Sequence, residues 1–319
     1  MTERHYWGWP VACYLFLGGL GGGMTVLACV FNLFLGDGQP FALALFAAAA
    51  AVGAGCFFLI FELGRPLQFW RVFSKQKAVM TFGAWVLLIL MFVNVINVSF
   101  LSGWFPWSRG GSLQDLVAAV DLALGVAVVV YTGVLLSSMK ARAFWNTPAL
   151  PALFLVSGLS TGAAADALLV GRWPFNGLHS TVVLATESLH HLDTVLVVFE
   201  LGVVLLYVTL MYTSADPTAR LSAGRWLLGS LAWAFWGGVV AVGLLVPLAA
   251  YGIGGAVAVT LAPTLVIAGG VFVRFLVVYS DDRRLLAGEQ RYWERLPKGD
   301  EAFLQAWRGG EPDSSSGTR

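Results

Sequence analysis

The sequence predicts an all-α integral membrane protein with eight transmembrane helices, arranged as two four-helix bundles. Hydrophobic residues make up 58% of the 319 residues and charged residues only 12%, about half the charged fraction of an ordinary soluble domain. The apolar residues are concentrated in eight runs, each close to the roughly 20 residues that a helix needs to cross the hydrocarbon core. Tryptophans gather near the ends of these runs, as is typical of the membrane interface.

Polar segments or Gly and Pro residues separate the eight apolar runs. The runs cover residues 10–35, 41–61, 79–101, 113–139, 148–170, 189–212, 226–250 and 254–279. Residues 1–280 therefore form one membrane domain, and residues 281–319 form a charged C-terminal tail whose Ser/Gly-rich end we expect to be disordered. Pro247 and Pro263 fall within or near the ends of the last two runs, where we expect them to kink the helices.

Two residue types in the apolar runs have a structural interpretation. The glycine-rich segment Gly18–Gly23 has small residues four apart, which favours close packing of the first helix against a neighbour. It is not a phosphate-binding loop, because it lies inside a span and no strand precedes it. Cys13, Cys29 and Cys56 lack the CxxC spacing of a cluster site, so we interpret them as small buried hydrophobic side chains.

The distribution of basic residues predicts the orientation. An even number of spans places both termini on one face, called here the terminal face. The basic residues on this face are Arg4, Arg65, Arg71, Lys75, Lys77, Lys140, Arg142, Arg220, Arg225 and seven more after Tyr279. The opposite face has only Arg109 and Arg172, so the positive-inside rule predicts cytoplasmic termini in the cell inner (cytoplasmic) membrane. The alternative is that these basic loops are positive because they dock a partner protein.

Ionisable and phenolic side chains at membrane depth are candidates for function, because burying them is costly. Glu62 and Arg65 follow the second span, either as an interfacial pair or as the border of a polar cleft for a ligand or a proton. Tyr14 in the first span and Tyr131 in the fourth reach similar depth near the terminal face. Two phenols at one depth could bind the carbonyl oxygens of a quinone, and core packing is the alternative.

A second polar set lies in spans four, five, six and eight. It consists of Asp121, Asp166, Asp193, Glu200 and Arg274. Asp193 and Glu200 are two helical turns apart and therefore share one helix face. A chain of acids with a single Arg suits a proton pathway, and buried structural ion pairs would explain the same pattern.

Histidine placement argues against a transmembrane haem. His5, His179, His190 and His191 lie at or near span ends, and adjacent His190 and His191 point apart around a helix. We therefore predict neither haem nor an iron–sulfur cluster in this chain, and no catalytic redox centre or metal. Since nucleotide and nucleic-acid motifs are also lacking, the expected partners are membrane lipid and another subunit that exchanges electrons.

Six motifs, taken in order, resemble the NrfD/polysulfide reductase membrane subunits. They are WGWPVACYLFLGGLGGG, ELGRPLQFW, YTGVLLS, SGLSTGA, LHHLDTVLVVFEL and GGVFVRFLVVYS, and they extend over nearly the whole membrane domain. The resemblance implies an anchor that exchanges electrons between the menaquinone or ubiquinone pool and a four-cluster ferredoxin-like iron–sulfur subunit. That subunit would serve a molybdopterin-type catalytic subunit.

The resemblance also implies roles for particular residues. Tyr131 matches the fourth-helix tyrosine at the quinone head, whereas Tyr14 stands where some members have a His and Val11 where a relative has an Asn. Because the iron–sulfur subunit meets the terminal face in this family, we expect it to dock on Arg71, Lys75, Lys77 and the C-terminal tail.

Two other functional classes are alternatives. A secondary transporter or ion pump also has intramembrane acids and kinked helices, and a scaffold anchor needs no quinone. The lack of a visible inverted repeat favours the redox family over a transporter.

Overall fold

In a computed structural model of the chain, the structure describes residues 7–36, 38–62, 79–102, 111–172, 179–255, 257–280 and 282–283. Eight helices in these ranges are long and apolar enough to cross a membrane, so the predicted all-α, eight-span fold is confirmed. The helices are α1 (Trp9–Leu35), α2 (Ala42–Glu62), α3 (Val79–Ser102), α4 (Ser112–Ser137), α5 (Ala149–Leu169), α6 (His179–Tyr212), α7 (Pro217–Leu227), α8 (Val246–Ile253) and α9 (Ala262–Val278). A 3-10 turn, η1 (Gln39–Phe41), precedes α2, and π-helical stretches η3 (Trp233–Leu245) and η4 (Val257–Leu261) precede α8 and α9.

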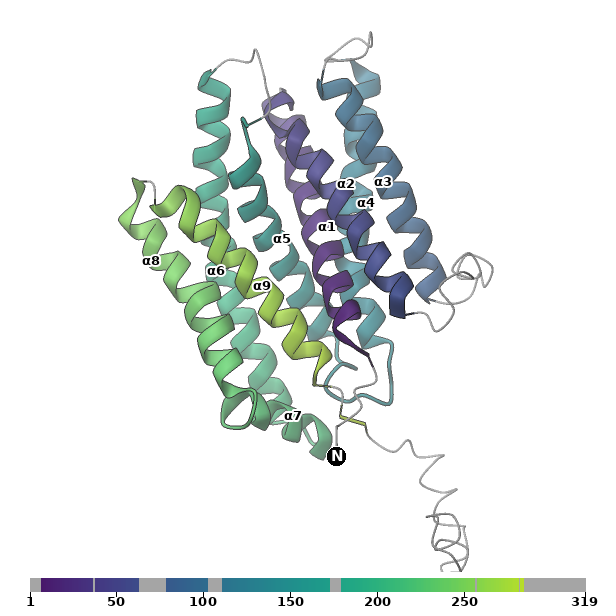
Figure 1. The fold of residues 1–319 in the computed structure, drawn as a ribbon, viewed down its shortest axis with the longest axis vertical. Coiled ribbons are helices and arrows are strands. Elements are labelled where there is room, and N and C mark those ends of the chain that lie inside the picture. The colour runs from purple at the N-terminus through teal and green to yellow at the C-terminus, as the bar shows by residue number, and fades with distance from the viewer. Residues whose placement is uncertain are drawn as a thin grey trace, which may run out of the picture. The chain divides into compact units, whose positions relative to one another are not determined.

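The spans form two groups of four. In the first group α1 packs against α2 and α4, and α3 packs against α2 and α4. In the second group α5 packs against α6 and α9, and α9 packs against η3 and α8. Contact between α1 and α5 joins the groups, and Figure 1 shows both helices in the middle of the bundle.

Glycines allow α1 and α5 to approach closely. A Cβ atom at Gly23 would lie 2.0 Å from the carbonyl oxygen of Gly158, and one at Gly162 would lie 2.4 Å from the carbonyl carbon of Gly23. Only hydrogen fits between backbones at that separation, so the small-residue spacing predicted from the sequence serves this interface.

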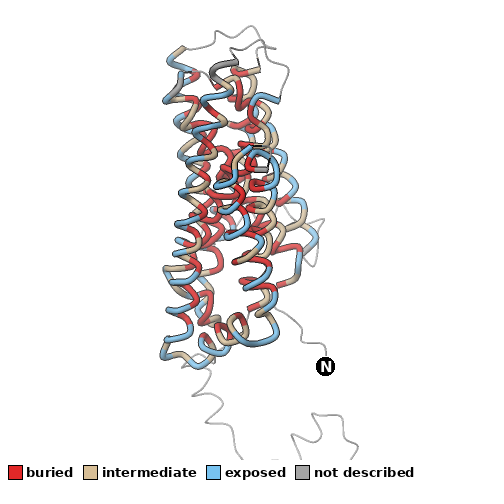
Figure 2. Tube along the Cα trace, turned by 90° about the vertical axis from the view of Figure 1, so that its left-hand side faces the viewer, coloured by how far each residue is buried: buried red, intermediate tan, exposed pale blue. Residues whose placement is uncertain are grey.

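Exposed apolar side chains cover the outside of the spans. Phe57, Phe82, Phe92 and Phe199 are each more than half exposed, and the burial pattern in Figure 2 places exposed positions along the outer sides of the helices. Since a soluble protein seldom exposes so much apolar surface, we interpret these faces as lipid contacts. The buried polar residues lie inside the bundle instead.

The structure corrects two predicted boundaries. α6 begins at His179, ten residues before the predicted start of span six. The predicted run 226–250 is divided, because Trp226 belongs to the separate helix α7 and the seventh span begins at Trp233. The backbone turns between them, where the amide of Leu231 donates to the carbonyl of Arg225 at 3.1 Å.

Two prolines mark irregular parts of the last two spans. Pro247 and Pro263, at which we expect kinks, each lie in the first turn of an α-helix that directly follows a π-helical stretch. A π-helix closes its hydrogen bonds one residue further along the chain than an α-helix, and long stretches of it are rare. Thirteen residues of η3 therefore give span seven a helix geometry that hydrophobicity does not predict.

Candidate functional site

Tyr14 and Tyr131 lie side by side in the first four-helix group. Tyr14 is five residues into α1 and Tyr131 is six residues before the end of α4, so both lie near the terminal face. Their hydroxyl groups are adjacent, and the side chains are only 1% and 5% exposed. The Tyr14 hydroxyl has no hydrogen bond of good geometry to any described residue. A buried phenol of this kind is suited to bind an oxygen atom of a ligand.

Helices α2 and α3 complete the surroundings of the two tyrosines. A Cβ atom at Gly83 of α3 would lie 1.7 Å from Cζ of Tyr131 and 2.2 Å from its hydroxyl oxygen. Only glycine fits there while the ring keeps its place. Cys56 of α2 interacts with both tyrosines. All four helices of the first group therefore contribute to this tyrosine site.

Of the other site residues predicted at the terminal face, the structure describes only the backbone of Glu62. Glu62 is the last residue of α2, which places its backbone at the terminal-face end of that helix, while its side chain lies outside the described residues. Arg65, Arg71, Lys75 and Lys77 also lie outside them. Their roles stay predictions.

Asp121 lies in a buried polar cluster between α1, α3 and α4. Nδ2 of Asn97 donates to Oδ2 of Asp121 at 3.0 Å, and Sγ of Cys29 lies 3.8 Å from the same oxygen. About one turn away, Nδ2 of Asn94 donates to Oγ1 of Thr25 at 3.0 Å. All of these residues are fully buried. Cys29 is therefore buried as predicted, and it contacts these polar groups in addition to the apolar core around it.

Asp166 of α5 extends this first cluster. Its carboxyl group interacts electrostatically with Cys29, and Asp166 follows Gly158 and Gly162 at intervals of four residues, on the side of α5 that faces α1. The residue is 0% exposed, and neither carboxyl oxygen has a hydrogen-bond partner among the described residues. Buried acceptors of this kind are usually satisfied by a proton or by water.

Arg274 of α9 organises a second cluster between α5, α6 and α9. Its guanidinium donates to the hydroxyl of Ser157 and, at 3.3 Å, to the carbonyl oxygen of Phe154. The guanidinium carbon also lies 4.6 Å from the centroid of the Phe154 ring. Glu200 interacts electrostatically with Arg274 and contacts Ser157. Glu200 is thus a buried carboxyl group in the electrostatic range of Arg274, without a direct ion pair between them among the described residues.

Asp193 lies two turns from Glu200, towards the face opposite the terminal face. It accepts a hydrogen bond from the hydroxyl of Tyr251 in α8. The ring of His190 lies 5.9 Å from the ring of Tyr251, centroid to centroid. The second cluster therefore extends from Arg274 towards the end of α6 that lies at the face opposite the terminal face.

All five predicted intramembrane charges are buried, with exposed fractions of 0% to 2%. The contacts divide them into two clusters, with Asp121 and Asp166 in one and Asp193, Glu200 and Arg274 in the other. Arg274 brings the second cluster near α1, because a Cβ atom at Gly19 would lie 3.1 Å from its Nη2. Their assignment to a proton pathway stays a prediction.

Sequence reasoning missed four polar residues that complete the clusters. Asn94 and Asn97 lie three residues apart in an apolar run, and that spacing on one helix face was an available signal. Ser157 and Tyr251 carry no such signal, because their partners come from other helices. In the described residues, no group of three or more His, Cys, Asp or Glu side chains could hold a metal ion.

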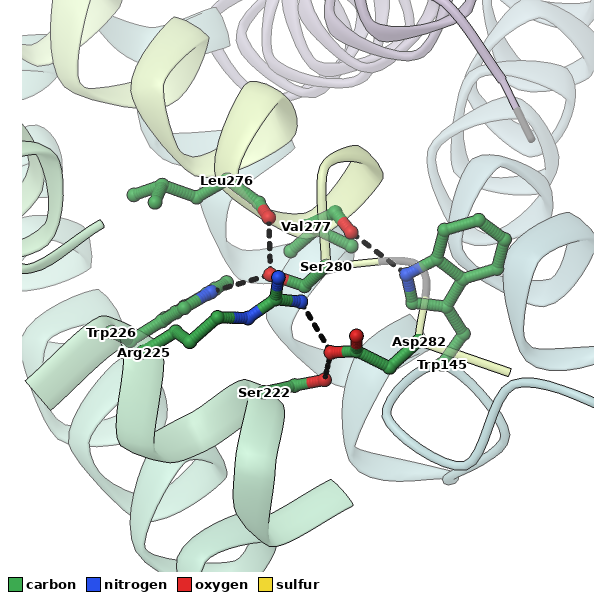
Figure 3. A network of polar contacts seen from close by, with 8 residues as sticks. All are labelled: Trp145, Ser222, Arg225, Trp226, Leu276, Val277, Ser280 and Asp282. Carbon is green, nitrogen blue, oxygen red and sulfur yellow. Dashed lines mark hydrogen bonds and ion pairs between the residues drawn. The ribbon is translucent and has the colours of Figure 1, made fainter. Parts of the chain in front are cut away.

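Two tryptophans fix the terminal-face end of α9 (Figure 3). Nε1 of Trp145, before α5, donates to the carbonyl oxygen of Val277 at 2.7 Å. Nε1 of Trp226, on α7, donates to Oγ of Ser280 at 2.6 Å. Both donors are fully buried indoles, so the end of α9 is tied to two neighbouring segments.

Asp282 continues this network beyond α9. Its carboxylate accepts from the hydroxyl of Ser222 and pairs with the guanidinium of Arg225, both on α7 (Figure 3). The start of the C-terminal tail is thereby attached to the terminal-face side of the second group.

Eight spans with polar clusters buried in their interior define a polytopic helical membrane protein. The chain belongs to the NrfD family, described as polysulphide reductase, NrfD, whose family model matches residues 1–281. It is 33% identical to a polysulfide reductase chain of Wolinella succinogenes over 303 residues, covering 86% of this chain and 93% of that protein.

Two further relatives span most of the sequence. The identity to protein NrfD of Escherichia coli is 29% over 272 residues, with 77% of this chain and 84% of that protein covered. The identity to a selenate reductase subunit of Mesobacillus selenatarsenatis is 25% over 326 residues, with 87% and 74% covered.

Proposed function

We propose that this chain is the quinone-binding and quinol-binding membrane anchor of a multi-subunit oxidoreductase. In this proposal it exchanges electrons between the menaquinone or ubiquinone pool and a four-cluster ferredoxin-like iron–sulfur subunit, which serves a molybdopterin-type catalytic subunit. Two relatives are named as parts of a polysulfide reductase and a selenate reductase, which supports membership of such a complex. The observation that carries the proposal is the pair of buried tyrosines near the terminal face whose hydroxyl groups are adjacent.

The tyrosine site offers hydrogen bonds at the depth that this function needs. A bound quinone supplies two-electron, two-proton redox chemistry. Tyr131 and Tyr14 would hold its head group by hydrogen bonds, and Gly83 keeps the Tyr131 ring in place. Glu62 and Arg65, which follow in sequence at the end of α2, would border the site and connect it to water.

The buried acids would serve as the route for protons. Asp193, Glu200 and Arg274 form a hydrogen-bonded and electrostatic series across the second group. Asp121 of the first group and Asp166 of the second form a shorter series around Cys29, where the two groups meet. Carboxyl groups joined by hydroxyls can pass protons along short hydrogen-bonded steps. These acids would move protons during quinone turnover and, by extension, translocate protons across the membrane.

The terminal face would receive the iron–sulfur subunit. Its basic residues Arg71, Lys75 and Lys77, together with the C-terminal tail, offer the positive charge for docking. The same charge distribution supports cytoplasmic termini and a place in the cytoplasmic membrane.

Replacing Tyr131 by Phe tests the quinone site. The change removes one hydroxyl and keeps the ring, so we expect the fold to survive. A lost hydrogen bond typically costs about 0.5 to 1.5 kcal/mol, so quinone binding should weaken roughly two- to tenfold. The measurement is quinol-coupled turnover of the assembled complex beside partner activity with an artificial dye. The first should fall and the second should be unchanged.

Two further variants sharpen this test. Gly83→Ala should impair quinol turnover as well, because the added methyl group overlaps the Tyr131 ring, whereas Gly202→Ala in α6 meets no atom within 4 Å and serves as the control. Unchanged quinol kinetics in both Tyr131→Phe and Tyr14→Phe would remove the tyrosine site from consideration.

Replacing Asp193 by Asn tests the proton route. The amide oxygen can still accept from Tyr251, so assembly should be retained, but an amide can no longer carry the proton. Positioned acid–base groups contribute about a hundredfold or more to rate, and we expect quinol-coupled turnover to fall by at least about tenfold. The matched control is Glu187→Gln on the exposed side of the same helix. Equal turnover in both variants would contradict the route.

A further inference from the structure

Helix α7 has one face on the bundle and one face away from it. It begins after Asp216, whose carboxylate accepts from the amide of Thr218 at 2.9 Å, and it lies across the terminal-face end of the second group (Figure 1). Ser222 and Trp226 are buried against the bundle. The free face carries Arg220 and Leu221, both exposed.

The free face of α7 borders a groove at the membrane boundary. Tyr212, the last residue of α6, lines this groove together with Pro217, Arg220 and Leu221. The volume of the groove is about 470 Å³. Because α6 ends at Tyr212 and the next span begins at Trp233, the groove lies where the hydrocarbon core gives way to the polar headgroups. Its lining combines one guanidinium with an aromatic ring and apolar side chains.

The two arginines of α7 differ in their partners. Arg225 forms an ion pair with Asp282. Arg220, in contrast, has an exposed guanidinium that makes no hydrogen bond or ion pair with any side chain in the described part of the protein. An arginine presented beside a groove matches the two-oxygen geometry of a phosphate group.

Further exposed apolar side chains follow the groove residues in the sequence. Leu221 is 59% exposed, Leu228 is 87% exposed and Trp233 is 72% exposed. A leucine next to a basic residue on a short helix, followed by an exposed Trp at the start of the next span, is typical of elements that lie in the membrane interface, with apolar groups among the acyl chains. Exposing so much apolar surface to water would be unfavourable.

We propose that this groove binds an anionic glycerophospholipid. The guanidinium of Arg220 contacts the phosphate group, the Tyr212 ring lies against the glycerol region, and the acyl chains lie on Leu221, Leu228 and Trp233. This lipid site is separate from the tyrosine site, because it lies on α6 and α7 whereas Tyr14 and Tyr131 belong to the first group. It does not depend on the proposed quinone function.

The test is lipid retention by the full-length protein in the complex that it forms. The protein is reconstituted in nanodiscs of mixed phosphatidylglycerol and phosphatidylcholine, released, and examined by native mass spectrometry. We expect bound phosphatidylglycerol to exceed phosphatidylcholine. Arg220→Gln should weaken phosphatidylglycerol binding about fivefold, equivalent to ~1 kcal/mol, and leave phosphatidylcholine unchanged. The matched control is Arg172→Gln, which removes an exposed arginine from the opposite face.

A second variant tests the apolar part of the site. Leu228→Ser should lower retention of both lipids, because it places a polar group among the acyl chains without changing charge. Equal phosphatidylglycerol retention in Arg220→Gln and the unchanged protein would overturn the proposal. Loss of a protein subunit from Arg220→Gln with lipid retention intact would also overturn it, because it would assign this surface to a protein partner.

Discussion

Replacing Arg274 by Met should destabilise the protein by about 3 to 5 kcal/mol. The guanidinium is 0% exposed and is held by Ser157, the Phe154 carbonyl and the nearby Glu200. Met preserves much of the volume but removes the buried cation nearest to Glu200 and the hydrogen bonds to Ser157 and Phe154, and leaving a buried charge uncompensated typically costs this much. Unfolding by a denaturing detergent, followed by tryptophan fluorescence, measures the effect.

A double variant separates the charge effect from packing. Arg274→Met combined with Glu200→Gln removes both charges, so we expect it to be more stable than Arg274→Met alone, a departure from additivity that identifies coupled residues. Arg172→Met, at an exposed position, should stay within about 0.5 kcal/mol of the unchanged protein. Strictly additive losses in the double variant would show that Glu200 and Arg274 are not energetically coupled.

The fold could be predicted because one physical requirement dominates it. Each span must present about 20 apolar residues to lipid, and every such run in the sequence corresponds to a helix. The same requirement identified Asp193, Glu200 and Arg274, since a charge at membrane depth is costly unless it faces the interior. Their burial needed no knowledge of how the helices pack.

Other features depend on packing and could not be read from hydrophobicity. The predicted seventh run includes the last two residues of α7, Trp226 and Leu227, because the break at Gly229 and Ser230 is too short to interrupt an apolar run. The pairing of Tyr251 with Asp193 depends on α8 packing against α6. Asp166 belongs to the cluster of Asp121 rather than to that of Asp193 because it lies on the side of α5 that faces α1. Which neighbour a helix side faces depends on the rotation of the helix about its axis, and hydrophobicity does not determine that rotation.

Close contact between α1 and α5 makes Gly23 sensitive to the addition of a single methyl group. In Gly23→Ala the new Cβ would lie 2.0 Å from the carbonyl oxygen of Gly158, and the obstacle is backbone, which cannot rotate away as a side chain does. Alanine favours an isolated helix over glycine by up to about 1 kcal/mol, so any net loss of stability must come from packing.

Gly23→Ala should therefore lower stability by about 1 to 3 kcal/mol, the usual cost of overpacking. The control is Gly202→Ala in α6, where a Cβ atom meets nothing within 4 Å and stability should be unchanged or slightly higher. Because α1 also carries Tyr14 and passes Arg274 at Gly19, displacing it should reduce quinol-coupled turnover along with stability. Thermal unfolding in nanodiscs compares the two variants directly, and equal midpoints would contradict the close α1–α5 contact.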